Sequence, residues 1–246
     1  MILAPVIIYI VTLGIGYFYF ASSTQNSTIS TMKRIVKDHR QMIESFLAER
    51  QGDLSLVTDT YTYQELTNPE KLRTVFKKLQ HKSGAFVDLG IFDQQGVHIN
   101  YHGPYDLSGK NYRNEGWFKE VMGKGYYISN VFKGFRNVPH FVIAVVKVEK
   151  ERKWVIRATI DTQLFNALVE QVSIGKTGEA YILNEDGVLQ TSRRSGGELM
   201  EHVGKDSGTL MFHEGIRVIE QTNPGEENYL VATTWLNNRS WILVVR

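Results

Sequence analysis

The sequence of 246 residues contains no cysteine and only five prolines. Without cysteine there can be no disulfide, no thiolate ligand for a metal and no cysteine nucleophile. The formal net charge is only +2, so the chain lacks the strong positive field of nucleic-acid-binding proteins. We therefore expect no nucleic acid among its partners.

Motifs for enzymatic chemistry are also missing. The fragment Gly175–Thr177 partly matches the phosphate-binding loop motif, but Glu170 stands at the position where that motif requires a glycine. The segment that begins at His213 partly matches the His-Glu-x-x-His motif of zinc proteases, but Arg217 stands in place of the second histidine. No Gly-x-Ser-x-Gly is present. We expect that the chain is not an enzyme, binds no metal and needs no cofactor.

One uninterrupted apolar run, Ile2–Ala21, carries no charge over 20 residues. A helix of that length spans roughly 30 Å of hydrocarbon, which predicts a membrane helix over residues 1–21. A cleaved signal peptide should be shorter and led by a basic residue. Two lysines and an arginine at 33–37 follow the run. By the positive-inside rule, these basic residues place the rest of the chain in the cytoplasm, but long domains translocate largely regardless of charge. Both orientations stay open at this point.

A long helix is predicted after the polar stretch at 22–31. Apolar residues recur at spacings of three and four, interrupted by His39: Ile29, Met32, Val36, Ile43 and Phe46. Such a seam fits a helix packed on its own domain, and it equally fits a stalk that pairs with a second copy. A second helix begins after Asn68 as N-cap, with Pro69 in its first position.

From residue 86 the apolar period becomes that of strands. Five strands are predicted between 83 and 161, with a turn at Asp93–Gly96 and a short helix at Trp117–Met122 capped by Asn114. A helix opened by Asp161 follows, and then strands at 180–190, 208–212, 216–222, 228–236 and 240–246. Gly187 repeats the turn of Gly96, which indicates an internal duplication. The predicted fold class is α+β.

The order of these elements resembles a known family. The segments "YRNEGWFKEV", "YYISNVFKGFRNVPHFVIAVV", "WVIRATID" and "GKTGEAYILNEDGVLQTS" are similar to those of the extracytoplasmic double-Cache sensor region of bacterial transmembrane signalling proteins, most like sensor histidine kinases. The resemblance covers about residues 22–246. It implies two PAS-like antiparallel-sheet modules in tandem after a membrane helix and a long stalk helix.

The resemblance also implies a separate role for each segment of the chain. Residues 1–21 form the membrane helix, and 22–82 the long and second helices. Residues 83–161 form a membrane-distal module that holds a ligand, 162–173 a connecting helix, and 174–246 a membrane-proximal module. We expect an inner-membrane protein whose residues after about 21 lie in the periplasm or outside the cell, and a homodimer formed through the long helix.

A ligand site is predicted in the distal module, because a small-molecule pocket needs aromatic walls and a few convergent polar groups. Arg113 offers a fork of donors for a carboxylate, and Asp161 an acceptor for an ammonium. The expected site residues, for a small organic acid, amino acid or amine, are Arg113, Trp117, Phe118, Tyr127, Asn130 and Asp161. In family members that bind amino acids the motif has an arginine where Glu115 stands here, so amino-acid specificity does not follow.

Structural roles compete with each of these assignments. Asp161 precedes a helix and is equally an N-cap, and Trp117 is equally a core residue. Arg113, Lys133 and Arg136 are read most simply as solvated charges, and His140 as structural or exposed. At the level of function, the competing interpretations are a ligand-free module for dimerisation or partner contact, a surface-anchored hydrolase, and the sensor region of a chemoreceptor or diguanylate cyclase.

Overall fold

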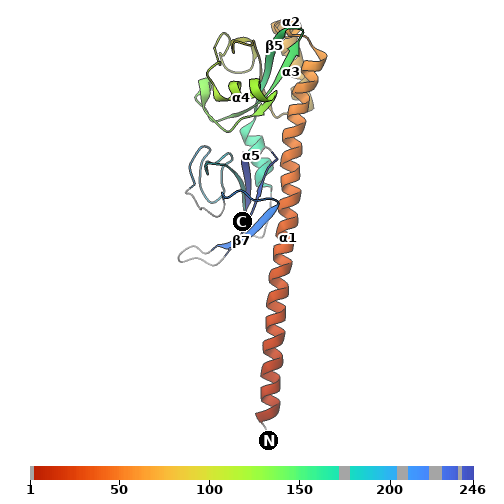
Figure 1. Ribbon diagram of the computed structural model, residues 1–246, viewed down its shortest axis with the longest axis vertical. Helices are drawn as coiled ribbons and strands as arrows, with labels where there is room; N and C mark the ends of the chain where they lie inside the picture. Colours follow the sequence, from red (N-terminus) through yellow and green to blue (C-terminus); the bar gives the residue numbers. More distant parts are fainter. Residues whose placement is uncertain (1–2, 172–177, 204–209, 222–228, 238–239) are drawn as a thin grey trace.

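A computed structural model describes residues 3–171, 178–203, 210–221, 229–237 and 240–246, with side chains from Tyr9 onward. One long helix, α1 (Leu3–Thr60), runs the length of the molecule, and two β-sheets lie along it one above the other (Figure 1). The first sheet lies beside the C-terminal end of α1, together with the helices α2 (Tyr63–Leu66) and α3 (Pro69–Lys82).

Helix α1 continues through the polar stretch at 22–31 without a break. Serine and threonine compete with helical hydrogen bonds unless their hydroxyls bond within the helix. Here the Thr24 hydroxyl donates to the Phe20 carbonyl at 2.9 Å, and the Thr28 hydroxyl donates to the Thr24 carbonyl at 3.0 Å. These bonds to the carbonyl four residues earlier keep the stretch helical.

The structure does not show the membrane helix expected over residues 1–21. Residues 3–21 are the first turns of α1, and from Tyr9 to Phe20 their large apolar side chains are more than half exposed. Within the residues whose side chains are described, no helix is long and apolar enough to cross a membrane. Residues 1–2 and the side chains of 3–8 lie outside that part.

The apolar seam of α1 packs on its own chain. Met32, Val36 and Ile43 are at least 96% buried against the two sheets. His39, in the same seam, is 7% exposed, and its Nε2 lies 2.7 Å from the carbonyl oxygen of Val169 in the helix α5 (Thr162–Glu170). Of the two interpretations of the seam, packing against its own domain is therefore the one observed at these positions.

Helix α3 begins as its sequence predicts. The Asn68 side chain accepts hydrogen bonds from the backbone N–H groups of Glu70 and Lys71, and Pro69 occupies the first helical position. The buried side chains of α3 then face the first sheet: Leu72, Val75, Phe76 and Leu79. The predicted start of this helix is confirmed.

The first sheet has the predicted five strands. They are β1 (Phe86–Phe92), β2 (His98–His102), β3 (Tyr126–Ile128), β4 (Phe141–Glu149) and β5 (Arg152–Ile160), in the antiparallel order β2-β1-β5-β4-β3. The short helix is α4 (Gly116–Lys124), and its N-cap is Glu115 rather than the expected Asn114. A single 3₁₀ turn, η1 (Gly134–Arg136), lies in the connection from β3 to β4.

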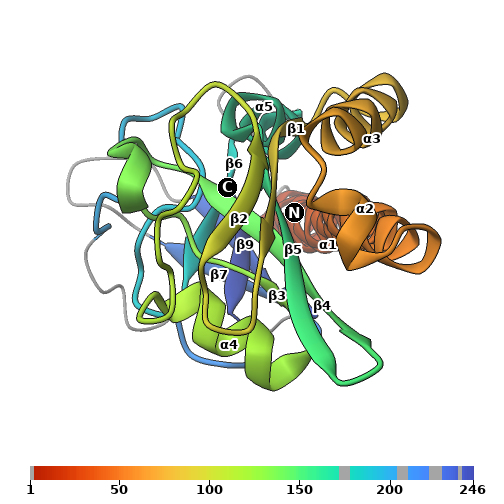
Figure 2. The ribbon, with the colours of Figure 1, turned by 90° about the horizontal axis from the view of Figure 1, so that it is seen from above.

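Alternation along the strands divides the first sheet into two faces. Trp154, Ile156 and Ala158 of β5 point into the core shared with α1 and α3. Val155 of β5 packs on the opposite face with α4, in a separate cluster. Figure 2 shows α1 and α3 on one side of this sheet and α4 on the other. The α4 face is the one on which Arg157 and Thr159 lie by the same alternation.

The second sheet contains β6 (Ala180–Asn184), β7 (Ile216–Gln221), β8 (Tyr229–Trp235) and β9 (Trp241–Val245) in the order β6-β9-β8-β7. The strand predicted at 208–212 is wrong for residues 210–212, which form no strand, while residues 208 and 209 lie outside the described residues. The predicted helix opened by Asp161 is α5, up to Glu170.

The two sheets share a turn built in the same way. The Asp93 Oδ1 accepts hydrogen bonds from the N–H groups of Gln95 and Val97, and Gly96 adopts φ +81°. In the second unit, the side-chain oxygen of Asn184 accepts from Asp186 and Val188, and Gly187 adopts φ +78°. The repeated bonding at equivalent positions supports the internal duplication inferred from the sequence.

A small set of contacts joins the first unit to the second. The indole of Trp241, fully buried in β9, packs edge-on against Phe141 and contacts Phe165 of α5. Its Nε1 donates to the Oδ1 of Asn130 at 2.7 Å. Next to it, the N–H of Val131 donates to the side-chain oxygen of Gln190 at 2.7 Å. The connection that follows β3 is thus anchored to the second unit.

Glycine 90, in the middle of β1, provides a test of this packing. A Cβ at this position would lie 2.3 Å from Nε2 of His98, whose ring is 1% exposed, so it would displace the ring. We expect Gly90→Ala to lower the free energy of unfolding by about 1–3 kcal/mol. In urea unfolding, Gly52→Ala is the control: Gly52 is an exposed helical position with nothing within 4 Å, where alanine should add about 0.5–1 kcal/mol. Equal effects of the two substitutions would contradict the packing described.

Candidate functional site

A buried arginine is the centre of the α4 face of the first sheet. Arg157 of β5 is 1% exposed, and its guanidinium carbon lies 5.0 Å from the ring centroids of Phe92, Tyr112 and Trp117. Such cation–π contacts stabilise a desolvated cation by about 2 kcal/mol. Among the described residues no carboxylate forms an ion pair with Arg157. The positive charge is therefore enclosed by aromatic rings rather than neutralised.

The second feature of this face is a buried ion pair. Asp88 of β1 is fully buried, and its Oδ2 accepts a hydrogen bond from Nη2 of Arg136, which is 8% exposed. The Tyr101 hydroxyl donates to the same carboxylate at 3.1 Å, and the N–H of Thr159 donates at 3.2 Å. Burial raises the pKa of the Tyr101 phenol, and the Asp88 charge raises it further. The carboxylate of Asp88 is thus fully engaged by its own chain.

Two histidines beside the ion pair are uncharged. Burial, together with the positive charge of Arg157, lowers the pKa of His98 to about 3. Burial also lowers the pKa of His140 to about 4, although its Nδ1 lies 2.8 Å from the Val138 carbonyl oxygen. The His98 ring stacks on Phe92 with centroids 4.1 Å apart. At neutral pH, these side chains add hydrogen-bonding groups without adding charge.

Several donors on this face have no hydrogen-bond partner in the described part of the chain. They include Nε and Nη2 of Arg157, Nε of Arg136, Nε1 of Trp117 and the hydroxyl of Thr159, and neither ring nitrogen of His98 reaches hydrogen-bond geometry. A buried polar group left unpaired costs about 1–3 kcal/mol, so native proteins seldom leave several together. Their concentration on one sheet face marks this face as the candidate binding site.

Trp117 and Phe118, two of the predicted site residues, lie at this face. They are 4% and 3% exposed, and they pack with Phe92 and Tyr112 in the aromatic cluster. The ring centroids of Trp117 and Phe92 are 5.3 Å apart. The core role that the sequence left open for Trp117 is therefore observed, Phe118 is buried in the same cluster, and the unpaired indole N–H of Trp117 leaves it a group that a ligand could bind.

Tyr127 lies at the border of the site, whereas Arg113 does not enter it. Tyr127 of β3 is half-buried against the same cluster, and burial raises the pKa of its phenol. Arg113 is exposed, and the described contact of this residue is made by its backbone N–H, which donates to Asn111 Oδ1 at 2.9 Å. The structure thus places the Arg113 side chain in solvent, away from the buried cluster.

Asn130 and Asp161 make contacts away from Trp117. Asn130 accepts its hydrogen bond from Trp241 in the second unit. The carboxylate of Asp161 accepts from the N–H groups of Gln163 and Leu164, so it is the N-cap of α5. The structure brings Trp117, Phe118 and Tyr127 together, and it sets Asn130 and Asp161 at the joint between the two units.

Sequence reasoning missed the charged residues of the cluster. The interpretation of Arg136 as a solvated charge is wrong, because the residue is buried against Asp88. Asp88 and Arg157 each interrupt a strand that is otherwise apolar, in "AFVDLGIF" and "KWVIRATI". A charge in the middle of a buried strand needs a partner or a ligand, and that signal could have found both residues.

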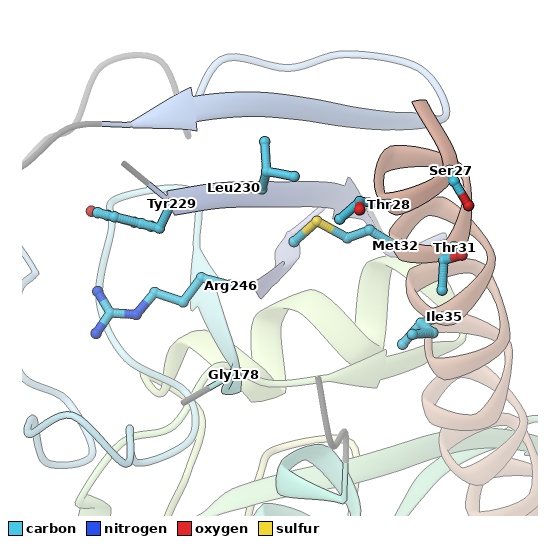
Figure 3. A pocket seen from close by; sticks show the side chains of 9 residues that line it. All are labelled: Ser27, Thr28, Thr31, Met32, Ile35, Gly178, Tyr229, Leu230 and Arg246. Atoms are coloured by element: carbon cyan, nitrogen blue, oxygen red, sulfur yellow. The ribbon is translucent and has the colours of Figure 1, made fainter. Parts of the chain in front are cut away.

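A second candidate, in the other half of the molecule, is weaker. A cavity of about 420 Å³ lies between α1 and the second sheet (Figure 3), lined by Ser27, Thr28, Thr31, Met32, Ile35, Gly178, Tyr229, Leu230 and Arg246. Its one charged group, the Arg246 guanidinium, points away from α1, and its Nε lies 2.6 Å from Oε1 of Glu179. The cavity is thus mainly apolar, with its charge already neutralised. In the described part of the chain, no three His, Asp or Glu side chains are grouped as metal ligands.

Comparison with known proteins assigns the class. The family model of the Cache domain matches residues 20–246, so the chain belongs to the Cache-domain family. Domains of this class are non-catalytic, ligand-binding sensor modules, which removes the hydrolase alternative. No curated protein is similar to the chain at a significant level.

Solved structures agree on the fold at low sequence identity. The ligand-binding domain of the Pseudomonas aeruginosa PAO1 amino-acid chemoreceptor PctC, in complex with GABA, has a TM-score of 0.66 at 11% identity, over 87% of this chain and 97% of that one. The extracellular domain of rpHK1S-Z16, described as a histidine kinase, has 0.63 at 14% identity, over 85% and 90%. An extracellular ligand-binding receptor from Desulfohalobium retbaense DSM5692 has 0.68 at 10% identity over 86% of this chain, which spans only 39% of that receptor.

The neutral histidines predict acid sensitivity. The folded-state pKa values of His98 and His140 lie below the ordinary value of 6.5, so the unfolded chain binds more protons in acid. Their contribution to stability is therefore complete above pH 6.5 and is lost as the pH falls towards 4 and 3, at up to roughly 1.4 kcal/mol per pH unit for each residue. Urea unfolding between pH 7.5 and 4.5 should show a smaller pH slope in His98→Gln than in the wild type.

The matched control for this experiment is His81→Gln, because His81 is exposed at the end of α3. This substitution removes one imidazole without changing the buried cluster. A His98→Gln protein with an unchanged pH slope would contradict the assignment of His98 as a buried neutral residue, whatever the change in its absolute stability.

Proposed function

We propose that this chain is the extracytoplasmic sensor domain of a membrane-bound signal-transduction protein. The first unit, residues 83–161, binds a small organic acid, amino acid or amine. The second unit, residues 174–246, transmits the resulting conformational change towards the membrane. The observation that carries this proposal is the group of buried, unpaired donors around Arg157, which a small ligand would satisfy. A two-component histidine kinase is our preferred output, supported by the fold of rpHK1S-Z16. The resemblance to PctC equally supports a chemoreceptor, and a diguanylate cyclase is a further alternative.

The proposed route of the signal begins on β5. This strand carries Arg157 and Thr159 at the site and ends next to Asp161, which caps α5. At the other end of α5, the Val169 carbonyl contacts His39 of α1. A displacement of β5 by a ligand would therefore reach α1 through one short helix. A ligand shifts such an equilibrium only if it binds the two states with different affinity.

Attachment to the inner membrane and dimerisation belong to the same proposal. The exposed apolar side chains from Tyr9 to Phe20 need a nonpolar environment, and residues 1–21 would find it in the bilayer, with the domain in the periplasm. A groove of about 250 Å³ lies between α1 and α3, bordered by Leu56, which is 61% exposed. This outer side of residues 22–82 would pair with a second copy, while the seam of α1 stays packed inside its own chain.

One observation favours a second function. Trp117 and Phe118 are almost fully buried in their own aromatic cluster, as they would be in a ligand-free module for dimerisation or partner contact. Such a module would not respond to small molecules.

The four tryptophans allow one experiment to test binding and transmission. Trp117 lies at the site, Trp154 on the α1 face of the first sheet, Trp241 at the joint, and Trp235 in a separate cluster of the second sheet. We expect 5-fluorotryptophan-labelled protein, titrated with organic acids, amino acids and amines, to shift the ¹⁹F resonances of Trp117 and Trp241. Binding that shifts only Trp235 would place the ligand in the second unit and contradict the proposal.

Transmission through the joint is tested by two asparagines. Each accepts one hydrogen bond from the second unit: Asn130 from Trp241 at 2.7 Å, and Asn166 from the Ser192 N–H at 2.8 Å. Asn130→Leu should leave the Trp117 response intact and weaken the Trp241 response, and Asn166→Leu, which removes a bond between α5 and the second unit, provides the comparison for the route through α5. A full Trp241 response in Asn130→Leu would exclude this connection as the route.

A further inference from the structure

We propose that the site around Arg157 binds a small, singly charged anion, such as a monocarboxylate, and rejects zwitterions and amines. This inference rests on the proposed sensor function and narrows its ligand. It is based on the charge balance of the buried residues and on the donors they leave unpaired. The ligands named for similar structures, among them GABA, would therefore not be ligands of this chain.

The charge balance favours one negative charge. All of residues 83–161 are described, and within them Asp88 is the one buried acidic side chain, against the two buried arginines 136 and 157. Asp88 neutralises Arg136, while Arg157 faces aromatic rings. The buried cluster thus holds a net charge of +1, because His98 and His140 are neutral there. A monoanion brings it to zero, whereas a dianion would leave an excess of negative charge in a desolvated site.

The unpaired donors fit the same ligand. The Nε and Nη2 atoms of Arg157 lie on one edge of its planar guanidinium, the arrangement that binds both oxygens of a carboxylate. The indole N–H of Trp117 and the hydroxyl of Thr159 are further unpaired groups on this face. The aromatic rings of Phe92, Tyr112 and Trp117 provide walls for a short apolar tail.

Within residues 83–161, all of which are described, an ammonium group finds no free buried carboxylate. Asp88 already accepts from Arg136, Tyr101 and the Thr159 backbone, and it would have to break these bonds to receive a ligand cation. Asp161 is occupied as the cap of α5. An ammonium beside Arg157 would also place two like charges in a buried site, which disfavours binding strongly.

Matched ligands separate these possibilities. Butyrate and GABA share a four-carbon chain and differ by one ammonium group. Propionate and alanine also differ by one ammonium group, and succinate is propionate with one additional carboxylate. With calorimetry and thermal unfolding on the 246-residue chain, we expect butyrate and propionate to bind at least about tenfold more tightly than GABA, alanine and succinate. Stability should rise with the logarithm of butyrate concentration by mass action.

Substitutions on strand β5 test whether butyrate binds at Arg157. Arg157→Gln should abolish the butyrate-dependent rise in unfolding temperature, and Arg157→Lys, which keeps the charge but loses the fork, should weaken butyrate binding about tenfold or more. The control is Arg152→Gln: Arg152 is exposed on the same strand and also lies over an aromatic ring, that of Tyr63 at 4.6 Å. It should bind butyrate as the wild type does. If Arg157→Gln does not fold, the test is the butyrate affinity of Arg157→Lys compared with that of Arg152→Gln.

Each outcome has a defined meaning. If GABA, alanine or an amine binds as tightly as butyrate, or if Arg157→Lys leaves butyrate affinity unchanged, the inference fails while the sensor function stands. If no acid, amino acid or amine binds at about 10 mM, where even a millimolar affinity would be detected, both the inference and the proposed function fail.

Discussion

The buried pairing of Asp88 with Arg136 is the interaction on which the organisation of the first unit depends. It ties β1 to the connection between β3 and β4, and it also holds Tyr101 and the backbone of β5. Removing one partner of a buried pair leaves an uncompensated charge and is strongly destabilising. Because this pair is complete in itself, the charge of Arg157 remains unmatched, and this imbalance distinguishes the candidate site from an ordinary core.

The remaining architecture isolates that site and connects it to the rest of the molecule. Period-two alternation on β4 and β5 sends one set of side chains into the large core with α1 and the other set to the α4 face. The large core is continuous from the first sheet to the second, with Trp241 in contact with Phe141 and Phe165. A change on one face of the first sheet therefore acts on a strand whose other face is part of the core of both units.

Local features were predictable from the sequence because they depend on neighbouring residues. The Asn68 cap, the Asp93–Gly96 turn and the five strands of the first sheet follow from local bonding and alternation. The burial of Arg136 was not predictable in this way, because its partner Asp88 is 48 residues away in sequence. Arg157 was missed for the same reason, because Trp117, one of the rings that it faces, is 40 residues away in sequence.

The unbroken course of α1 limits how the two units can move. At a rise of 1.5 Å per residue, its 58 residues extend over about 87 Å, and the same rod packs against both sheets. Bending at a flexible linker is therefore not available as a mode of motion along this side of the molecule. A relative displacement of the units along this side would be sliding along α1 or turning about it, so the proposed signal would reach the N-terminal end of α1 as a small axial shift or twist rather than as a hinge angle.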